Sequence, residues 1–194
     1  MAKVRLRAIS CFSFMEKKRH KDKRIILFLG TENHHCMDDQ KKEGRYSRIY
    51  EQLKELTGKT DQPLARMASI CAVLHHKMDH YFWTGFYLYL DNRLTVGPYQ
   101  GPVACQELEK DRGVCWAAVN RKAPVVVPDV HAFPGHIACD ARSRSEITLP
   151  VFDPRGDVFA VFDVDSAMPA AFSEVDSRHL EKILSLIFQN LTPS

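Results

Sequence analysis

The chain has 194 residues, six of them cysteine, and 27 Lys and Arg against 24 Asp and Glu give a net charge of +3. A chain of this length can build one hydrophobic core without disulfides or metal. The 45% apolar and 26% charged fractions exclude a wholly disordered chain, a collagen-like chain and a small disulfide scaffold. No apolar run approaches the roughly 20 residues of a membrane span, so we expect no membrane association.

Positive charge is concentrated at the N-terminus. Residues 1–48 hold 13 basic and 6 acidic residues, a net of +7, whereas residues 49–194 hold 14 basic and 18 acidic, a net of −4. The acidic body gives no general attraction to nucleic acid, and we expect none to bind. The basic run at residues 17–24 is typical of a solvated arm, with a targeting or nucleic-acid role as alternatives.

Residues 1–43 are polar and lack apolar periodicity. We therefore expect a poorly ordered N-terminal extension that is dispensable for chemistry, followed by one domain over residues 44–194. The first 15 residues are basic and free of acids, faintly like a mitochondrial transit peptide. We expect a cytoplasmic protein, with mitochondrial targeting left as an alternative.

Helical periodicity begins in the second segment. The first helix is predicted over residues 46–56, with Gly58 as its stop. A second helix follows, with Pro63 in its first turn. Its apolar stripe places Cys71 in the core as a small hydrophobe. The stripe comprises Leu64, Met67, Cys71, Leu74 and Met78.

Strand patterns occupy the middle of the chain. Residues 81–90 and 94–100 predict one hairpin, and residues 146–153 and 157–165 predict another. Between them we expect a short helix from Gly113, a valine-rich strand at residues 124–128, and a long polar loop over residues 129–145, a length that is usually functional.

The last element is a helix. Ser173 and Asp176 resemble a capping box at its start. One apolar face is predicted, formed by Leu180, Ile183, Leu184, Ile187 and Leu191. Helices at both ends and hairpins between them indicate an α+β fold, with a central antiparallel sheet and helices packed on it.

Three cysteines lie within 35 residues, spaced as C-x9-C-x23-C: Cys105, Cys115 and Cys139. No C-x-x-C pair is present, so neither a zinc ribbon nor a thioredoxin-type motif is indicated. Buried, inert thiols are one interpretation. Two features favour reactive thiols instead. Cys115 falls in the first turn of a predicted helix, where the dipole favours a thiolate, and Cys139 follows His136 in the polar loop.

A metal site built from His131, His136 and Cys139 lacks closely spaced ligand pairs, so we expect no bound metal. Acidic residues also stand in apolar strands: Glu146, Asp163 and Asp165. Such side chains either point to solvent or line a pocket with raised pKa values.

Several segments together resemble one known family. They are Trp83–Tyr87, Gln100–Cys105, Gly113–Cys115, Asp129–Asp140, Ser143–Ile147 and Phe162–Ser166. Over about residues 45–190 the chain resembles the free methionine-(R)-sulfoxide reductase family of GAF-domain proteins, and the segment that ends in Cys139 is the most specific. One departure is Trp116, where the family usually has a glycine. Its bulk bears on the start of the helix and on a redox role for Cys115.

The resemblance implies a GAF fold and a thiol mechanism. Cys139 would attack the sulfoxide sulfur and become a sulfenic acid. Cys105 would then form a disulfide with it, with Cys115 as an alternative partner. Thioredoxin would reduce that disulfide, and no cofactor would be bound.

The resemblance also implies the substrate-binding residues. The acids Glu146, Asp163 and Asp165 would bind substrate, beside the aromatic residues Trp83 and Tyr87. The oligomeric state is left between a monomer and a homodimer. Two other classes are weighed against this reading, a GAF domain that senses a small ligand without catalysis and a structural zinc-binding interaction module.

Overall fold

The computed structural model describes residues 38–135 and 140–191. Cys139 and His136 of the long polar loop, and nearly all of the N-terminal extension, lie outside these ranges. The described elements, in chain order, are helices α1 (Asp39–Thr57) and α2 (Pro63–Lys77), strands β1 (Trp83–Leu90), β2 (Arg93–Gln100) and β3 (Glu107–Leu108), helix α3 (Gly113–Arg121), strand β4 (Val125–Val127), the 3-10 turn η1 (Val130–Ala132), strands β5 (Ser145–Phe152) and β6 (Val158–Ser166), helix α4 (Glu174–Leu184) and the 3-10 turn η2 (Ser185–Ile187).

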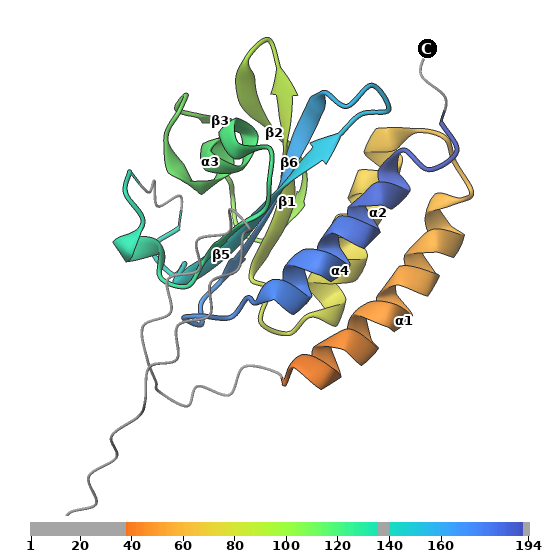
Figure 1. The fold of residues 1–194 in the computed structure, drawn as a ribbon, viewed down its shortest axis with the longest axis horizontal. Coiled ribbons are helices and arrows are strands. Elements are labelled where there is room, and N and C mark those ends of the chain that lie inside the picture. The colour runs from red at the N-terminus through yellow and green to blue at the C-terminus, as the bar shows by residue number, and fades with distance from the viewer. Residues whose placement is uncertain (1–37, 136–139, 192–194) are drawn as a thin grey trace, which may run out of the picture. The chain divides into compact units, whose positions relative to one another are not determined.

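The strands form one sheet in the order β3-β2-β1-β6-β5-β4. Every neighbouring pair in it is antiparallel. The central contact joins β1 to β6, which are far apart in the sequence, so the two predicted hairpins meet edge to edge. Figure 1 shows α1, α2 and α4 on one face of the sheet and α3 on the other. This is the predicted α+β fold with a single antiparallel sheet.

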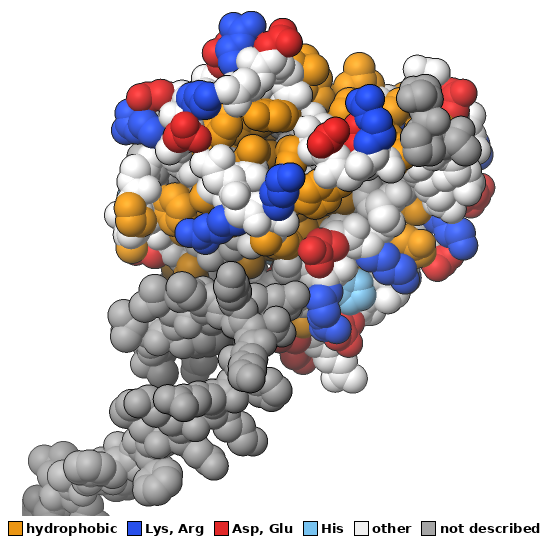
Figure 2. All heavy atoms as spheres, turned by 45° about the horizontal axis from the view of Figure 1, so that its top comes forward, with side chains coloured by type: hydrophobic (Ala, Val, Ile, Leu, Met, Phe, Trp, Pro, Cys, Tyr) orange, Lys and Arg blue, Asp and Glu red, His pale blue; other side chains and the backbone are white. Residues whose placement is uncertain are grey.

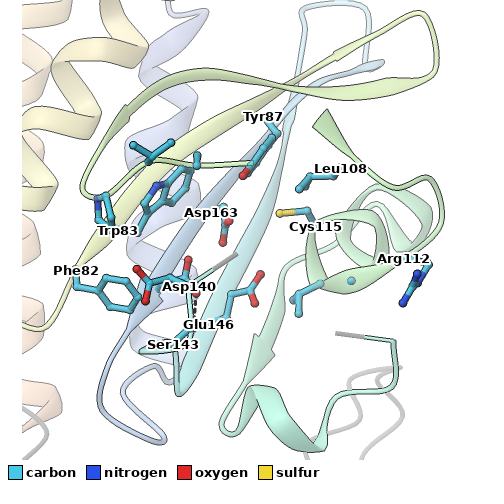
Figure 3. Close-up of a pocket in the computed structure, with 16 residues that line it drawn as sticks. Phe82, Trp83, Tyr87, Leu108, Arg112, Cys115, Asp140, Ser143, Glu146 and Asp163 are labelled. Carbon is cyan, nitrogen blue, oxygen red and sulfur yellow. Dashed lines mark hydrogen bonds between the residues drawn. The ribbon is translucent and has the colours of Figure 1, made fainter. Parts of the chain in front are cut away.

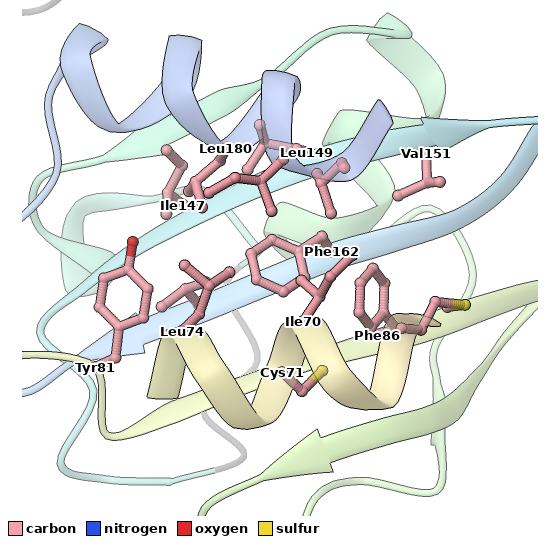
Figure 4. Packing of buried hydrophobic residues seen from close by; sticks show 14 of the residues in the cluster. Ile70, Cys71, Leu74, Tyr81, Phe86, Ile147, Leu149, Val151, Phe162 and Leu180 are labelled. Carbon is pink, nitrogen blue, oxygen red and sulfur yellow. The ribbon is translucent and has the colours of Figure 1, made fainter. Parts of the chain in front are cut away.

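A large apolar core fills the space between the sheet and helices α2 and α4. Figure 4 shows Ile70 and Leu74 of α2 against Phe86 and Phe162, whose rings lie 4.8 Å apart between centroids. Cys71 is 1% exposed and packs here as a small hydrophobe, as the sequence predicted. A second cluster lies on the opposite face, beneath α3, and it borders the candidate site.

Local sequence explains where the elements turn. Asp91 and Asn92 both have positive φ, 50° and 61°, the backbone that a two-residue hairpin turn requires and that Asp and Asn tolerate. The capping box at α4 forms as predicted, with Ser173 accepting from the Val175 N–H and Asp176 accepting from the Ser173 N–H.

The predicted domain boundary at Gly44 is wrong, because α1 already begins at Asp39. Lys42 is 1% exposed and donates to Asp176 Oδ2 over 2.5 Å and to the Ala171 carbonyl over 2.8 Å. A lysine carries no apolar signal, so the periodicity that begins at Tyr46 hides this first turn. The folded domain therefore includes residues that the sequence assigned to the extension.

One further expectation needs correction, and one element was missed. The last helix ends at Leu184 and continues as a 3-10 turn to Ile187, so Leu191 is not on a helical face. Strand β3 has only two residues and was not predicted from the sequence. Its side chains offer too short a pattern to detect.

The surface is mixed in charge. On the face shown in Figure 2, Lys and Arg side chains alternate with Asp and Glu around small apolar areas. None of the helices within the described ranges has both the length and the apolar character needed to cross a membrane.

Candidate active site

The candidate site is built from side chains on the α3 side of the sheet. Antiparallel register places Trp83 opposite Asp165, and Asp165 opposite Glu146. Asp163 stands one row further along the sheet, opposite Gly85 on β1. Because side chains of alternate residues share a face, the three acids and Trp83 project toward the same space.

A pocket occupies this space. It is lined by Trp83 and Tyr87 of β1, Cys115 of α3, Glu146 of β5, and Asp163 and Asp165 of β6. Figure 3 shows Cys115 projecting from α3 into the pocket, with the carboxylates of Asp163 and Glu146 near it. Six of the eight substrate-site and catalytic residues expected from the sequence therefore meet in one place.

One wall of the pocket is aromatic. Trp83 stacks on Tyr87 with ring centroids 5.8 Å apart, and on Tyr99 with centroids 5.6 Å apart. Gly85 makes this arrangement possible, because a Cβ there would lie 2.5 Å from the Trp83 ring and 2.4 Å from Tyr99 Cβ. The Trp83 ring therefore covers the backbone of its own strand.

The adjoining wall, on β5 and β6, is acidic. Glu146 and Asp163 are each 6% exposed. Burial, followed by the charges of the neighbouring acids, raises the pKa of Glu146 well above its usual range. Burial and then Asp165 do the same to the pKa of Asp163. Burial raises the pKa of Asp165 to about 6, against the opposing hydrogen bond from Ser143. Three neighbouring carboxyl groups, two of them buried, cannot all ionise here, so the pocket holds protons.

Cys115 does not have the thiolate character expected from its place on α3. Burial, followed by the charges of Asp163 and Glu146, raises the pKa of its thiol well above the ordinary value. In a buried position beside these acids, the two effects outweigh the helix dipole, so the side chain is a neutral thiol. Trp116 is 2% exposed, packs edge-on against Tyr89 and leaves the helix start at Gly113 unaltered.

The other two cysteines differ in what the structure describes. Cys105 is disulfide-bonded, and it follows the pocket-lining residues Pro102, Val103 and Ala104. Among the described residues Cys71 and Cys115 are free. Cys139 lies outside the described residues, but its neighbour Asp140 lines the pocket. Of the two histidines that were weighed as metal ligands and set aside, His131 is exposed and His136 lies outside the described residues.

Sequence reasoning missed several pocket residues. Ser143 donates a hydrogen bond to Asp165 Oδ1 and is buried. Arg112, at the N-cap of α3, and Phe82, just before β1, also line the pocket. Phe82 lies inside the strand predicted over residues 81–90, and Ser143 stands three residues before the strand predicted from residue 146. These positions were the available signal. Arg112 stands in a polar connection with no such pattern.

The antiparallel sheet with a pocket under one short helix defines the class of protein, and the GAF domain family matches residues 67–191. GAF domain-containing protein A of Dictyostelium discoideum is 42% identical over 75% of this chain and 92% of its own length. The free methionine-R-sulfoxide reductase of Escherichia coli is 40% identical over 63% of this chain and 73% of its own length.

A solved structure agrees with these relatives. The free methionine-R-sulfoxide reductase of Neisseria meningitidis, in complex with its substrate, is 34% identical and aligns with a TM-score of 0.72 over 84% of this chain and 93% of that chain. The chain belongs to the free methionine-R-sulfoxide reductase family of GAF domains.

Proposed function

We propose that this protein reduces free methionine-(R)-sulfoxide to methionine by a thiol mechanism and is recycled by thioredoxin. One observation carries the proposal. An acidic wall and an aromatic wall adjoin in one pocket, and Cys115 is among its lining residues. Family membership supports the reaction class, because relatives carry the name free methionine-R-sulfoxide reductase.

The two walls match the two ends of the substrate. An α-ammonium group entering the pocket would stabilise one ionised carboxylate among Glu146, Asp163 and Asp165, which otherwise repel one another. The S-methyl group packs well on the rings of Trp83 and Tyr87. A peptide has an amide in place of the ammonium, so it would leave a buried carboxylate without its partner.

The chemistry then follows from the remaining protons. The sulfur of the Cys139 thiolate attacks the sulfoxide sulfur while a carboxyl group that is still protonated gives its proton to the oxygen. Transfer of the hydroxyl group to Cys139 releases methionine, and the cysteine becomes a sulfenic acid. The raised pKa values of Glu146 and Asp163 support this role, because they keep a proton available at neutral pH.

We propose Cys105 as the residue that removes the sulfenic acid. Its thiol attacks the Cys139 sulfur, water leaves, and a disulfide forms. The disulfide-bonded state of Cys105 supports this choice over Cys115, which is free and buried. A dithiol donor then reduces the bond by exchange, giving two thiols on the enzyme and a disulfide on thioredoxin.

The direct test follows NADPH consumption through thioredoxin reductase and thioredoxin. We expect turnover with the free R epimer and essentially none with the free S epimer or with N-acetyl-methionine sulfoxide. If kcat/KM for the acetylated compound is comparable to that for the free R epimer, no carboxylate binds the substrate ammonium. A flat trace with every substrate would favour a GAF domain that only senses its ligand.

Cysteine variants divide the mechanism into steps. Cys139→Ser should release no methionine in a single turnover, because a hydroxyl is a far weaker nucleophile. Cys105→Ser should release about one equivalent of methionine and then stall with thioredoxin. Cys71→Ser, in the other core cluster, is the matched control and should cycle normally. Full cycling by Cys105→Ser would assign the second thiol to Cys115.

A further inference from the structure

Three side chains with metal-binding atoms converge in the pocket from three different elements. Cys115 Sγ comes from α3, and one carboxylate oxygen each comes from Glu146 on β5 and Asp163 on β6. These atoms all lie within 4.8 Å of one another. The three residues are 4%, 6% and 6% exposed. Within residues 38–135 and 140–191, this is the group that has the composition and spacing of a metal site.

A second observation also points to a missing ligand. Asp163 Oδ1 is buried and has no hydrogen-bond partner, one of three such side-chain atoms among the described residues. An unsatisfied buried acceptor is destabilising. Its backbone is fixed in the centre of the sheet between β1 and β5. Asp163 Oδ1 therefore remains in the pocket, where a cation can bind to it.

We infer that this pocket is a binding site for Zn²⁺, coordinated by Cys115 Sγ and one carboxylate oxygen each of Glu146 and Asp163. Zinc accepts thiolate sulfur at about 2.3 Å and carboxylate oxygen at about 2.0–2.2 Å, which places tetrahedral ligands roughly 3.5 Å apart. The three ligand atoms, which lie within 4.8 Å of one another, must draw closer to bind the ion. Binding releases the proton of the Cys115 thiol and those of the carboxyl groups to solvent, so Zn²⁺ affinity should rise with pH. Hard cations such as Mg²⁺ and Ca²⁺ are disfavoured, because they require more oxygen ligands and avoid sulfur.

Three protein ligands leave the fourth zinc position to water, an arrangement that leaves the metal open to exchange. The site also uses two of the carboxylates to which the proposed function assigns the substrate ammonium. Zn²⁺ and the substrate are therefore mutually exclusive, and zinc is a reversible inhibitor. The inhibitory consequence rests on the proposed function, but the metal site itself does not. It also departs from the sequence expectation of no metal.

Binding is measured directly on the full chain, reduced with a phosphine and freed of metal. Cd²⁺ serves as a spectroscopic substitute for zinc, because thiolate coordination gives an ultraviolet charge-transfer band. We expect the band to saturate at one equivalent of Cd²⁺. Calorimetry should show that Zn²⁺ displaces the bound Cd²⁺. Cys115→Ser should abolish the band, and Asp163→Asn should weaken Zn²⁺ binding at least tenfold. Circular dichroism and thermal melts establish whether each variant is folded. If Cys115→Ser does not fold, Zn²⁺ binding by Asp163→Asn still tests the site.

Two controls separate this pocket from other thiols. Cys71→Ser removes the other described free cysteine, and Cys36→Ser removes the thiol of the sequence cluster His34-His35-Cys36. Both should bind Zn²⁺ and Cd²⁺ like the wild type. No binding by the wild type, or binding unchanged in both Cys115→Ser and Asp163→Asn, would overturn the site. Loss of binding in Cys36→Ser alone would move the metal to the N-terminal segment and overturn it equally.

Inhibition is tested without thioredoxin, whose own thiols bind zinc. In single-turnover methionine release, increasing Zn²⁺ should raise the substrate concentration needed for the half-maximal rate and leave the maximal rate unchanged. A fall in the maximal rate would contradict the shared-site inference. If the protein releases no methionine at all, the proposed function fails, whereas the binding experiments still decide the zinc site.

Discussion

Gly85 has the role of a spacer between two aromatic rings. Its missing side chain lets Trp83 lie across the strand between Tyr87 and Tyr99. Gly85→Ala should push the Trp83 ring away, because the added methyl group overlaps both that ring and Tyr99 Cβ. We expect a cost of about 1–3 kcal/mol in stability and a roughly tenfold or greater rise in KM for free methionine-(R)-sulfoxide, measured by steady-state kinetics.

The same substitution elsewhere is the control. Gly44 lies inside α1, where a Cβ meets only the end of the Arg48 side chain at 3.6 Å. Gly44→Ala should therefore stabilise the protein by about 0.5–1 kcal/mol and leave KM unchanged. An unaltered KM in Gly85→Ala would mean that the Trp83 ring does not bind the substrate.

His80 should make the stability of the protein depend on pH. Its ring packs edge-on against Tyr81, and its Nε2 is buried without a partner. Burial, followed by the charge of Lys42, lowers the pKa of His80 from 6.5 to about 4, against the opposing effects of Asp176 and Asp79. Between these two values the unfolded chain binds more protons than the folded one.

The contribution of neutral His80 to the free energy of unfolding should therefore be fully present above pH 6.5 and be lost as the pH falls toward 4. The loss assigned to His80 is on the order of 1–3 kcal/mol. Urea unfolding at several pH values measures it, and His80→Asn should flatten the dependence in this window. The slope that remains in the variant belongs to other groups. An unchanged slope in His80→Asn would show that His80 titrates normally in the folded state.

At the level of single residues, the sequence predicted the pocket composition better than its chemistry. The acids and aromatic residues were found because charged residues in apolar strands and a specific resemblance marked them. The protonation of Cys115 was misjudged. A helix dipole can be inferred from spacing, whereas burial beside Asp163 depends on strands that meet only in three dimensions. The Ser143 hydrogen bond to Asp165 was missed for the same reason.

Helices α1 and α4 are joined by a buried ionic network. Asp176 Oδ2 accepts from Lys42, and its Oδ1 accepts from the Tyr46 hydroxyl over 2.7 Å. Lys42→Met should destabilise the protein by about 3–5 kcal/mol, because it leaves a buried carboxylate without its cation. Urea unfolding measures the loss of free energy.

The neighbouring Lys41 is exposed, so Lys41→Met should change stability by no more than about 0.5 kcal/mol. The double variant Lys42→Met/Asp176→Asn should recover part of the loss, because the uncompensated charge is removed. A stability loss in Lys42→Met no larger than in Lys41→Met would mean that the pair contributes nothing.

At the level of elements, long periodic segments were predictable and short or charged ones were not. The hairpin around Asp91 and Asn92 and the capping box at Ser173 follow from local rules. The first turn of α1 escaped notice because Lys42 is buried only through a partner 134 positions away. The two-residue β3 exists because β2 offers it an edge, which no local pattern contains.

For the molecule as a whole, the correct start of the domain changes a truncation experiment. The sequence suggested that residues 1–43 are dispensable, but removing them deletes Lys42 and the first turn of α1. A chain that starts at Asp38 keeps the N-cap, whose side chain accepts from the Gln40 N–H over 3.4 Å. It should have the same melting temperature as the full chain, and its kcat/KM should agree with that of the full chain to within about twofold.

A chain that starts at Gly44 should lose at least the 3–5 kcal/mol expected for Lys42. Its melting temperature should fall accordingly, as thermal unfolding would report. Equal melting temperatures for the two truncations would contradict the assignment of residues 39–43 to the folded domain. A tenfold lower kcat/KM in the chain that starts at Asp38, with its fold intact, would show that the N-terminal segment reaches the pocket.

The pairing of Lys42 with Asp176 also sets when the protein can fold during its synthesis. At roughly 5–20 residues per second, about 7–27 s separate the synthesis of the two residues. During that interval α1 carries the apolar side chains of Ile49 and Leu53, which belong to the core beneath the helices, with no α4 to cover them. The core beneath the helices is therefore completed only after α4 has been synthesised.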